Sequence, residues 1–308
     1  MNWVQYKNGN YNVYIDLDNG TKIRKNDEDC FIPDTVESMD IKLTNRCNGA
    51  CQYCHEGSTI DGKHGDILSP SFLDKLHPYT ELALGGGNIL EHPDIDEFLK
   101  RCKERNHICN ITVNQKHFIE NYNRIKNWVD NKLVYGVGIS YTEPSYDLIE
   151  RAKKIPNSVI HVIAGLVSLE DLKILSKNNL KVLILGYKQV RRGKDFYNTY
   201  THDIIINYRT GLLKYYIKSI IESKWFNVVS FDNLAIKQLD IKNIFSEDQW
   251  NEFYMGDDGQ DGQQTSASMF VDMVERKFAR NSCAPESDRY ALLDTAEEMY
   301  AYLVNNKG

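Results

Sequence analysis

Short apolar runs alternate with amphipathic stretches through the middle of the chain. The amphipathic stretches repeat their apolar residues at helical spacing, as in 94–105, where Ile95, Phe98, Leu99 and Cys102 fall on one face of the predicted helix. Strands that alternate with helices predict a parallel sheet with right-handed crossovers. Six such units predict an α/β fold, a partial TIM-like (β/α)6 barrel. The six strands are expected at 39–43, 81–84, 109–113, 134–141, 159–164 and 181–185, and one of the helices between them is expected at 117–129.

The pattern changes toward both ends of the chain. Residues 11–17 alternate like a strand and are followed by an Asp-Asn-Gly turn, which predicts an N-terminal β-hairpin. After the sixth strand, the pattern indicates two helices and two strands, at 212–223, 227–231, 269–278 and 288–304. We therefore divide the chain into an N-terminal β-hairpin segment (1–35), a partial barrel (36–229) and an α+β C-terminal extension (230–308).

The composition is that of a folded protein with a sizeable core. Of the 308 residues, 42% are hydrophobic and 26% are charged, and the formal net charge of -6 argues against an extended nucleic-acid surface. We find no signal peptide and no apolar run long enough to span a membrane. Seven cysteines, an odd number with three close together, favour a reducing cytoplasm over a disulfide framework.

Three of the cysteines follow the first predicted barrel strand directly. Cys47, Cys51 and Cys54 have the spacing C-x3-C-x2-C, and a short loop can turn all three thiolates toward one metal centre. A 4Fe-4S cluster held by three cysteines leaves one iron without a protein ligand. A zinc site with His55 as fourth ligand is the alternative, but Cys54 and His55 are adjacent, which makes joint coordination of one ion awkward. Three unrelated buried thiols are a further alternative, which the clustering disfavours.

This cysteine loop, with Tyr53 before the last cysteine and Thr-Asn after the strand, resembles that of the radical S-adenosylmethionine (SAM) superfamily. The resemblance covers about residues 39–187 and implies that Cys47, Cys51 and Cys54 ligate the cluster and that Tyr53 packs near the adenine. In that family SAM binds the open iron through its amino and carboxylate groups. An electron from the cluster then yields methionine and a 5'-deoxyadenosyl radical, which takes a hydrogen atom from the substrate. The resemblance also implies an external electron donor of flavodoxin or ferredoxin type.

Positions at the ends of the next strands strengthen the resemblance. Gly85, Gly86 and Gly87 resemble the family's Gly-Gly-Glu loop, whose backbone holds the SAM amino group. Gly87 stands where an acidic residue is common, so only the backbone role carries over. Asn114 and Ser140 match positions that often contact the ribose or methionyl part of SAM, although a turn or helix N-cap is an equally ordinary role for such residues.

Two later segments supply further candidates. Ala164 and Gly165, after the fifth strand, resemble an adenine-contacting segment of the family. After the sixth strand, the cation-rich loop 188–194 sits at the site end of the barrel, where Lys188 or Arg191 would neutralise the SAM carboxylate or an anionic substrate. A solvated loop is the alternative interpretation.

The C-terminal extension resembles the SPASM/twitch-like regions of peptide-modifying family members, but without their auxiliary-cluster cysteines. Its single cysteine, Cys283, is a candidate hydrogen-atom donor, with a surface or packing cysteine as the alternative. One cluster is therefore expected. The predicted substrate is a peptide or a nucleotide, which the sequence does not separate. Activation of a glycyl-radical enzyme and a non-catalytic, metal-stabilised interaction module are the alternative functions.

Overall fold

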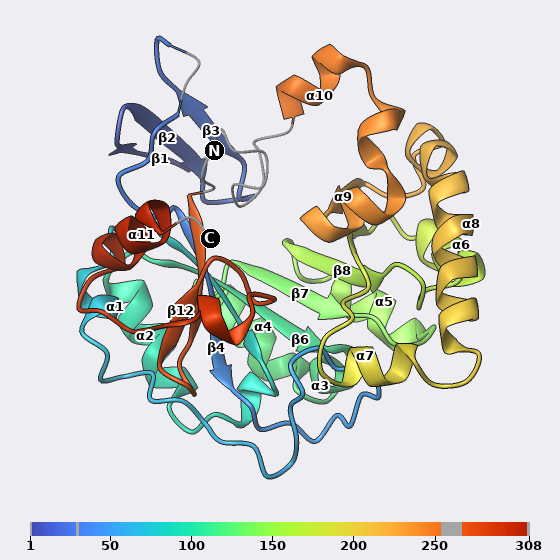
Figure 1. Cartoon of the computed structure of the whole chain (residues 1–308), viewed down its shortest axis with the longest axis horizontal. Coiled ribbons are helices and arrows are strands. Elements are labelled where there is room, and N and C mark those ends of the chain that lie inside the picture. Colours follow the sequence, from blue (N-terminus) through green and yellow to red (C-terminus); the bar gives the residue numbers. More distant parts are fainter. Residues whose placement is uncertain (1, 29–30, 254–266, 307–308) are drawn as a thin grey trace.

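The computed structural model describes residues 2–28, 31–253 and 267–306, and its centre is a ten-stranded sheet (Figure 1). The sheet order is β10-β9-β8-β7-β6-β5-β4-β11-β12-β13, and all neighbours from β10 to β11 are parallel. β10 and β13 are the two ends of this order, so the barrel is partial, as expected. The parallel strands are β4 (Ser38–Thr44), β5 (Glu81–Gly86), β6 (Ile108–Asn114), β7 (Gly136–Ser140), β8 (Ser158–Ile163), β9 (Lys181–Leu185), β10 (Val228–Phe231) and β11 (Ser268–Asp272).

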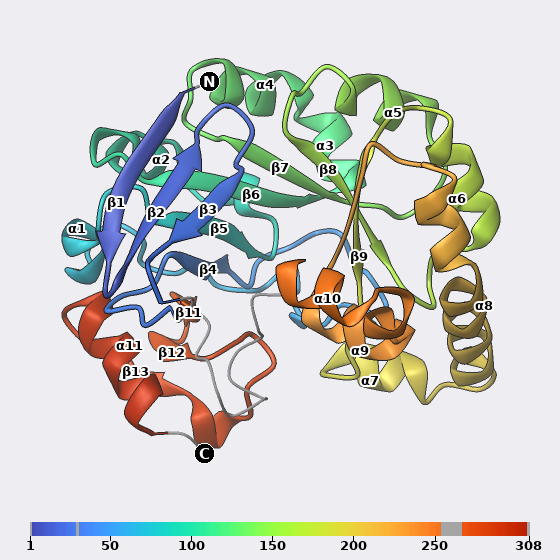
Figure 2. The same cartoon turned by 90° about the horizontal axis from the view of Figure 1, so that it is seen from above.

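Helices cover the outer face of this sheet, which Figure 2 shows from above. In α2, the predicted residues Ile95, Phe98, Leu99 and Cys102 are buried, because their helical spacing puts them all against the sheet. The helices are α1 (Phe72–Lys75), α2 (Ile95–Glu104), α3 (Gln115–Glu120), α4 (Tyr122–Asp130), α5 (Tyr146–Ala152), α6 (Leu169–Ser176), α7 (Arg192–Tyr197), α8 (His202–Glu222), α9 (Asn233–Leu239), α10 (Glu247–Phe253) and α11 (Ala296–Asn305). Short 3-10 turns lie at Ile89–Glu91, Ile241–Ile244 and Glu286–Asp288.

Several predicted boundaries were wrong for identifiable reasons. Residues 115–130 form two helices instead of one, because Asn121 leaves the helical conformation between them. The predicted strand 269–278 is a hairpin of β11 and β12 (Lys277–Ala279), and Asp272 forms its turn by accepting the N–H groups of Val274 and Glu275. The last helix begins at Ala296, after the short strand β13 (Tyr290–Ala291).

The N-terminal segment forms a three-stranded antiparallel sheet, one strand more than the predicted hairpin. β1 (Trp3–Asn8), β2 (Tyr11–Asp16) and β3 (Lys22–Lys25) pair in sequence order. Their buried residues pack on Ile108 at the start of β6, so the sheet covers the amino ends of the barrel strands. In Figure 1 it lies at the opposite end from the loop that follows β4.

Glu37 joins this N-terminal sheet to the barrel. Its buried carboxylate accepts a hydrogen bond of 2.6 Å from the Tyr11 hydroxyl, pairs with Arg24 at 2.7 Å and lies 3.3 Å from Lys22. Burial alone raises the pKa of Glu37, but the charge and hydrogen bonds of Arg24 and the charge of Lys22 outweigh it, and the pKa lies below its ordinary value of 4.5.

The C-terminal elements extend the same sheet. β11 pairs in parallel with β4, so that Asp272 is opposite Lys42, and β12 and β13 continue from it. The predicted boundary at residue 230 falls inside β10, which pairs with β9. The domain boundaries stay a prediction. The ten-stranded sheet contains strands from both the segment 36–229 and the segment 230–308. No helix in the described parts of the chain is long and apolar enough to cross a membrane.

The two faces of the barrel strands have different chemistry. In β6, Cys109, Ile111 and Val113 are buried, whereas the alternate residues Asn110 and Thr112 face the hollow interior. Since successive side chains of a strand point to opposite faces, the apolar set packs under the helices and the polar set lines the inside. The core therefore lies between sheet and helices, and the barrel interior is left free for a site.

We expect Glu37→Gln to destabilise the protein by about 3 kcal/mol, because it leaves the partly buried Arg24 without its carboxylate. Equilibrium urea unfolding measures the loss. Folding lowers the pKa of Glu37. Its contribution to the free energy of unfolding is therefore present above pH 4.5 and is lost as the pH falls through the pKa of Glu37 in the folded protein. The difference between wild type and variant should therefore shrink in acid. Glu150→Gln, which breaks a surface pair with Lys153 at 3.2 Å, is the matched control and should change little.

Candidate active site

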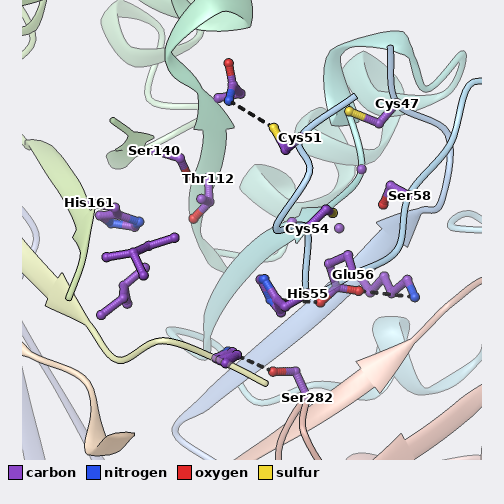
Figure 3. Close-up of a pocket in the computed structure, with 18 of the residues that line it drawn as sticks. Cys47, Cys51, Cys54, His55, Glu56, Ser58, Thr112, Ser140, His161 and Ser282 are labelled. Atoms are coloured by element: carbon purple, nitrogen blue, oxygen red, sulfur yellow. Dashed lines mark hydrogen bonds and ion pairs between the residues drawn. The ribbon is translucent and has the colours of Figure 1, made fainter. Parts of the chain in front are cut away.

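A cavity of about 350 Å³ opens at the carboxyl ends of the parallel strands. We call it the upper cavity. The loop after β4 forms one wall, and the ends of β5, β6, β7, β8 and β9 form the others, as Figure 3 shows for the labelled residues. In parallel barrels this end collects the side chains and loops that make active sites.

All three motif cysteines line this cavity. The loop that carries them is anchored by backbone hydrogen bonds, from Cys47 N–H to Thr59 C=O at 2.8 Å and from Thr59 N–H to Asn45 C=O at 3.0 Å. Ala50, between the first two cysteines, has a φ of 48°, which turns the chain tightly. The cysteines are half-buried, so the thiols face the cavity while the backbone lies against the protein.

Gly49 keeps the space between two of the sulfurs open. A Cβ atom at this position would lie 3.3 Å from Cys47 Sγ and 3.8 Å from Cys51 Sγ. The Gly49 N–H also donates to Cys47 Sγ at 3.3 Å. Burial raises the pKa of both the Cys47 and the Cys51 thiol, and the charge of the neighbouring Cys54 raises it further. The raised pKa values favour the neutral thiols in the metal-free protein, and thiolates this close together would be stabilised by the positive charge of a bound metal.

These residues fit a cluster better than a single metal ion. A zinc ion needs four ligands at about 2.0 to 2.3 Å from a single point, whereas three cysteines bind three different corners of a 4Fe-4S cube. His55, the alternative fourth zinc ligand, is engaged elsewhere, because its Nε2 lies 3.2 Å from Glu56 Oε1.

The glycine-rich end of β5 packs directly on the cysteine loop. Gly86 has a φ of 108°, and a Cβ there would lie 2.5 Å from the carbonyl oxygen of Thr44. A Cβ on Gly87 would lie 2.2 Å from that of Arg46. The Gly87 N–H donates to Thr44 C=O at 2.7 Å, so this N–H is used within the protein. Gly85 faces open space in the cavity, where its backbone is accessible to a ligand.

The other cofactor-binding candidates divide into two groups. Tyr53, Asn114, Ser140 and Lys188 line the upper cavity, as expected for contacts to a ligand. Asn114 is the N-cap of α3, where its Oδ1 accepts from the Lys116 N–H, and its Nδ2 lies 3.8 Å from Cys51 Sγ. Its contact with SAM stays a prediction. Burial raises the pKa of Tyr53 to about 12, so its phenol stays neutral. Lys188 reaches toward the C-terminal segment, with its Nζ 3.3 Å from Ser282 Oγ.

Four candidates do not line this cavity. Arg191 turns instead to the cysteine loop, where it donates to His55 C=O at 3.1 Å and lies 3.7 Å from Glu56. Cys283 is exposed on the surface beside Ser282, which is the residue that does line the cavity. Ala164 is buried in the core, and Gly165 packs on Ile206 of α8. The placement of Arg191 and Cys283 follows from long-range packing that a local pattern does not contain.

Comparison with known proteins identifies the fold. The model aligns with Streptococcus suis SuiB bound to S-adenosylmethionine at a TM-score of 0.59 and 13% identity, over 97% of this chain and 87% of that one. It aligns with SuiB bound to its precursor peptide SuiA at a TM-score of 0.55 and 15% identity, over 82% of this chain and 61% of that one. The chain shares the fold of SuiB.

The similarity is one of structure alone. No protein-family model matches the sequence, and no curated protein matches it either. The chain spans 61% of the SuiB chain in the peptide complex. At this identity the comparison establishes the shared architecture, and the roles of individual residues rest on the geometry of the cavity.

Sequence reasoning missed an ionic cluster beneath the cysteine loop. Lys42, 2% exposed, lies 3.2 Å from Glu56 and 3.1 Å from Asp272. Burial by itself raises the pKa of Glu56, but His55 and Lys42 lower it to about 2, so the carboxylate is ionised. The position of Lys42 inside an apolar strand could have indicated a buried ion pair. Nothing in the sequence around Asp272 indicates that it is a partner of Lys42. We call these three residues the Lys42 triad.

The Lys42 triad yields a stability prediction. Lys42→Met keeps the bulk of the side chain but leaves Asp272 buried without its counter-charge and Glu56 with only His55 and Arg191 beside it. The substitution should cost about 3 to 5 kcal/mol. Urea unfolding of the metal-free protein measures this. Adding Asp272→Asn to Lys42→Met should recover part of the loss, because it removes one uncompensated charge. Lys218→Met on α8 is the control, because its partner Glu222 is 3.9 Å away at the surface. Equal effects of Lys42→Met and Lys218→Met would contradict the assignment.

Proposed function

We propose that this protein is a radical SAM enzyme that holds one 4Fe-4S cluster through Cys47, Cys51 and Cys54 and abstracts a hydrogen atom from a peptide. The observation that carries the proposal is the position of these cysteines. They face a cavity at the carboxyl ends of a partial barrel whose fold matches SuiB, which has been crystallised with SAM and with a precursor peptide. Gly49 places no side chain beside the sulfurs of Cys47 and Cys51.

When bound, the cluster would supply the electron that cleaves SAM to methionine and a 5'-deoxyadenosyl radical. The residues of this chain hold and shield the reactants. Gly85 presents its backbone to the cavity, and Tyr53, Asn114 and Ser140 offer a ring and hydrogen-bonding groups around it. Lys188, which also lines the cavity, would offer a positive charge to the methionyl carboxylate.

A single cluster per chain is part of the proposal. Outside the motif, Cys102 and Cys109 are buried next to each other under the sheet, and Cys283 is alone at the surface. Cys30 lies outside the described residues. The described cysteines therefore provide ligands for one cluster, and its electron would come from an external donor of flavodoxin or ferredoxin type.

A peptide is the favoured substrate class because of the walls that the C-terminal region contributes. Phe270 of β11 and Ser282, beyond β12, line the cavity mouth, so the extension takes part in forming the site. The peptide complex of SuiB supports this choice. The negative net charge does not favour a polyanionic substrate.

Removal of one thiolate tests the cluster. Cys51→Ser, reconstituted with iron and sulfide under anaerobic conditions, should lose the brown colour that dithionite bleaches and should form no 5'-deoxyadenosine from SAM. Cys283→Ser is the matched control and should keep both properties, because Cys283 is exposed and outside the cavity. Colourless wild-type protein with one zinc per chain would contradict the proposal.

Gly49 offers a milder test of the same site. Gly49→Ala should weaken iron retention about 10-fold, because the methyl group enters the space between Cys47 and Cys51. Iron bound per chain after gel filtration measures this. Gly211→Ala is the control, since a Cβ there meets open solvent on α8. Unchanged iron content in Gly49→Ala would show that the cluster does not occupy this space.

A further inference from the structure

A second cavity continues the first into the barrel. It has a volume of about 680 Å³, and Ala83, Thr112 and His161 line both cavities. We call it the lower cavity. Its far wall includes the turn between β2 and β3 of the N-terminal sheet, at residues 15–21. Together the cavities exceed what one SAM molecule at the cysteine loop would fill, so the lower cavity is available to another ligand.

Three polar side chains on the inner wall of the barrel have no partner in the protein. Asn110 and Thr112 of β6 and His161 of β8 line the lower cavity, and Figure 3 shows Thr112 and His161 where they also line the upper cavity. Among the described residues, no hydrogen bond involves any of these three side chains. We call them the polar row. They are half-buried and open to the cavity, so their hydrogen-bonding groups are available to a ligand or to ordered water there.

Two glycines of β7 make room for the polar row. A Cβ on Gly138 would lie 2.3 Å from Cε1 and 2.5 Å from Nε2 of His161, so the imidazole rests on the bare backbone. A Cβ on Gly136 would lie 2.7 Å from Oδ1 of Asn110. Two glycines in one strand cost backbone entropy on folding. They leave the space that the side chains of His161 and Asn110 occupy.

The free groups of the lower cavity are uncharged. Burial lowers the pKa of His161 to about 4, so its ring is neutral at physiological pH and offers one donor and one acceptor. The charged residues of this cavity already have polar partners within the protein. Lys181 donates to Pro156 C=O at 3.1 Å and to Asn157 Oδ1 at 3.2 Å, Glu81 pairs with Lys22, and Asp16 accepts three hydrogen bonds. The polar row itself carries no charge, so a charged ligand group placed against it would meet only neutral partners.

We propose that the polar row binds an uncharged, hydrogen-bonding side chain of the peptide substrate and holds it below the SAM site. This inference rests on the proposed function and specifies the substrate class. The physical basis is the penalty for unpaired polar groups. A ligand that lacks hydrogen-bonding atoms leaves the row unsatisfied, and one that carries a charge is desolvated without compensation.

A binding experiment without the cluster tests the polar row directly. The probes are the peptides acetyl-Gly-Gly-Xaa-Gly-Gly-amide with Asn, Asp or Leu at Xaa, which have nearly equal side-chain size. In protein labelled with [15N]histidine, the Asn peptide should shift the ring nitrogen signals of His161, and the Asp and Leu peptides should not. The His161→Gln variant assigns the signals by their disappearance. A shift by the Asp peptide, or by none of the three, overturns the inference.

Turnover of the reconstituted enzyme provides the second readout. With wild type, the Asn peptide should raise the rate of 5'-deoxyadenosine formation above the peptide-free rate. We expect His161→Leu and Asn110→Leu each to raise the KM for this peptide about 10-fold, as the loss of one buried hydrogen bond implies. Gly138→Ala should do the same by displacing the imidazole. His77→Gln is the control and should leave the KM unchanged, because His77 lines neither cavity.

The outcomes separate the two proposals. If wild type forms no 5'-deoxyadenosine under any condition, the proposed function fails, while the NMR result still judges the polar row. If SAM alone shifts the His161 signals and the peptide adds nothing, the row belongs to the cofactor site and the inference is overturned. A shift by guanosine but by none of the peptides would overturn the peptide assignment.

Discussion

The ionic contact of Lys42 with Glu56 and Asp272 connects three parts of the chain that the site requires. Lys42 belongs to the first barrel strand, Glu56 follows the last motif cysteine, and Asp272 ends the C-terminal strand β11. Because charges this deeply buried are costly without partners, each of the three positions fixes the other two. The orientation of the cysteine loop therefore depends on a strand that comes more than 200 residues later in the chain.

Gly86 shows how closely this arrangement is packed. A side chain there would strike both the Thr44 carbonyl and Lys42, with a Cβ 2.9 Å from Lys42 Cγ. A glycine is therefore required at this position by the packing of the protein itself, independently of any ligand. Its resemblance to a cofactor-binding motif and its structural role are consistent, because a backbone that approaches this closely also exposes its polar groups to the neighbouring cavity.

The barrel interior differs from the filled core of a closed barrel. Bulky apolar residues usually fill that space in layers, whereas here Asn110, Thr112, Gly136, Gly138 and His161 line it. The apolar residues of the same strands lie under the outer helices, which supply the stability. The barrel interior is consequently not part of the hydrophobic core. It can hold polar groups that would be too costly to leave unpaired in such a core.

The sequence by itself determined the local features. Strand and helix alternation, the spacing of Cys47, Cys51 and Cys54, and the glycines after β5 are properties of short segments, so periodicity and spacing predict them correctly. Boundaries within 115–130 and 269–278 failed because single capping and turn residues, Asn121 and Asp272, decide them.

Tertiary structure alone decided which side chains meet. The exposure of Cys283, the turn of Arg191 toward His55 and the pairing of Lys42 with Asp272 depend on contacts between distant segments. The unpaired state of His161 likewise depends on Gly138 of the neighbouring strand. Burial and partner distance set the energy of a polar group, and neither is a property of the residue's own neighbours in sequence.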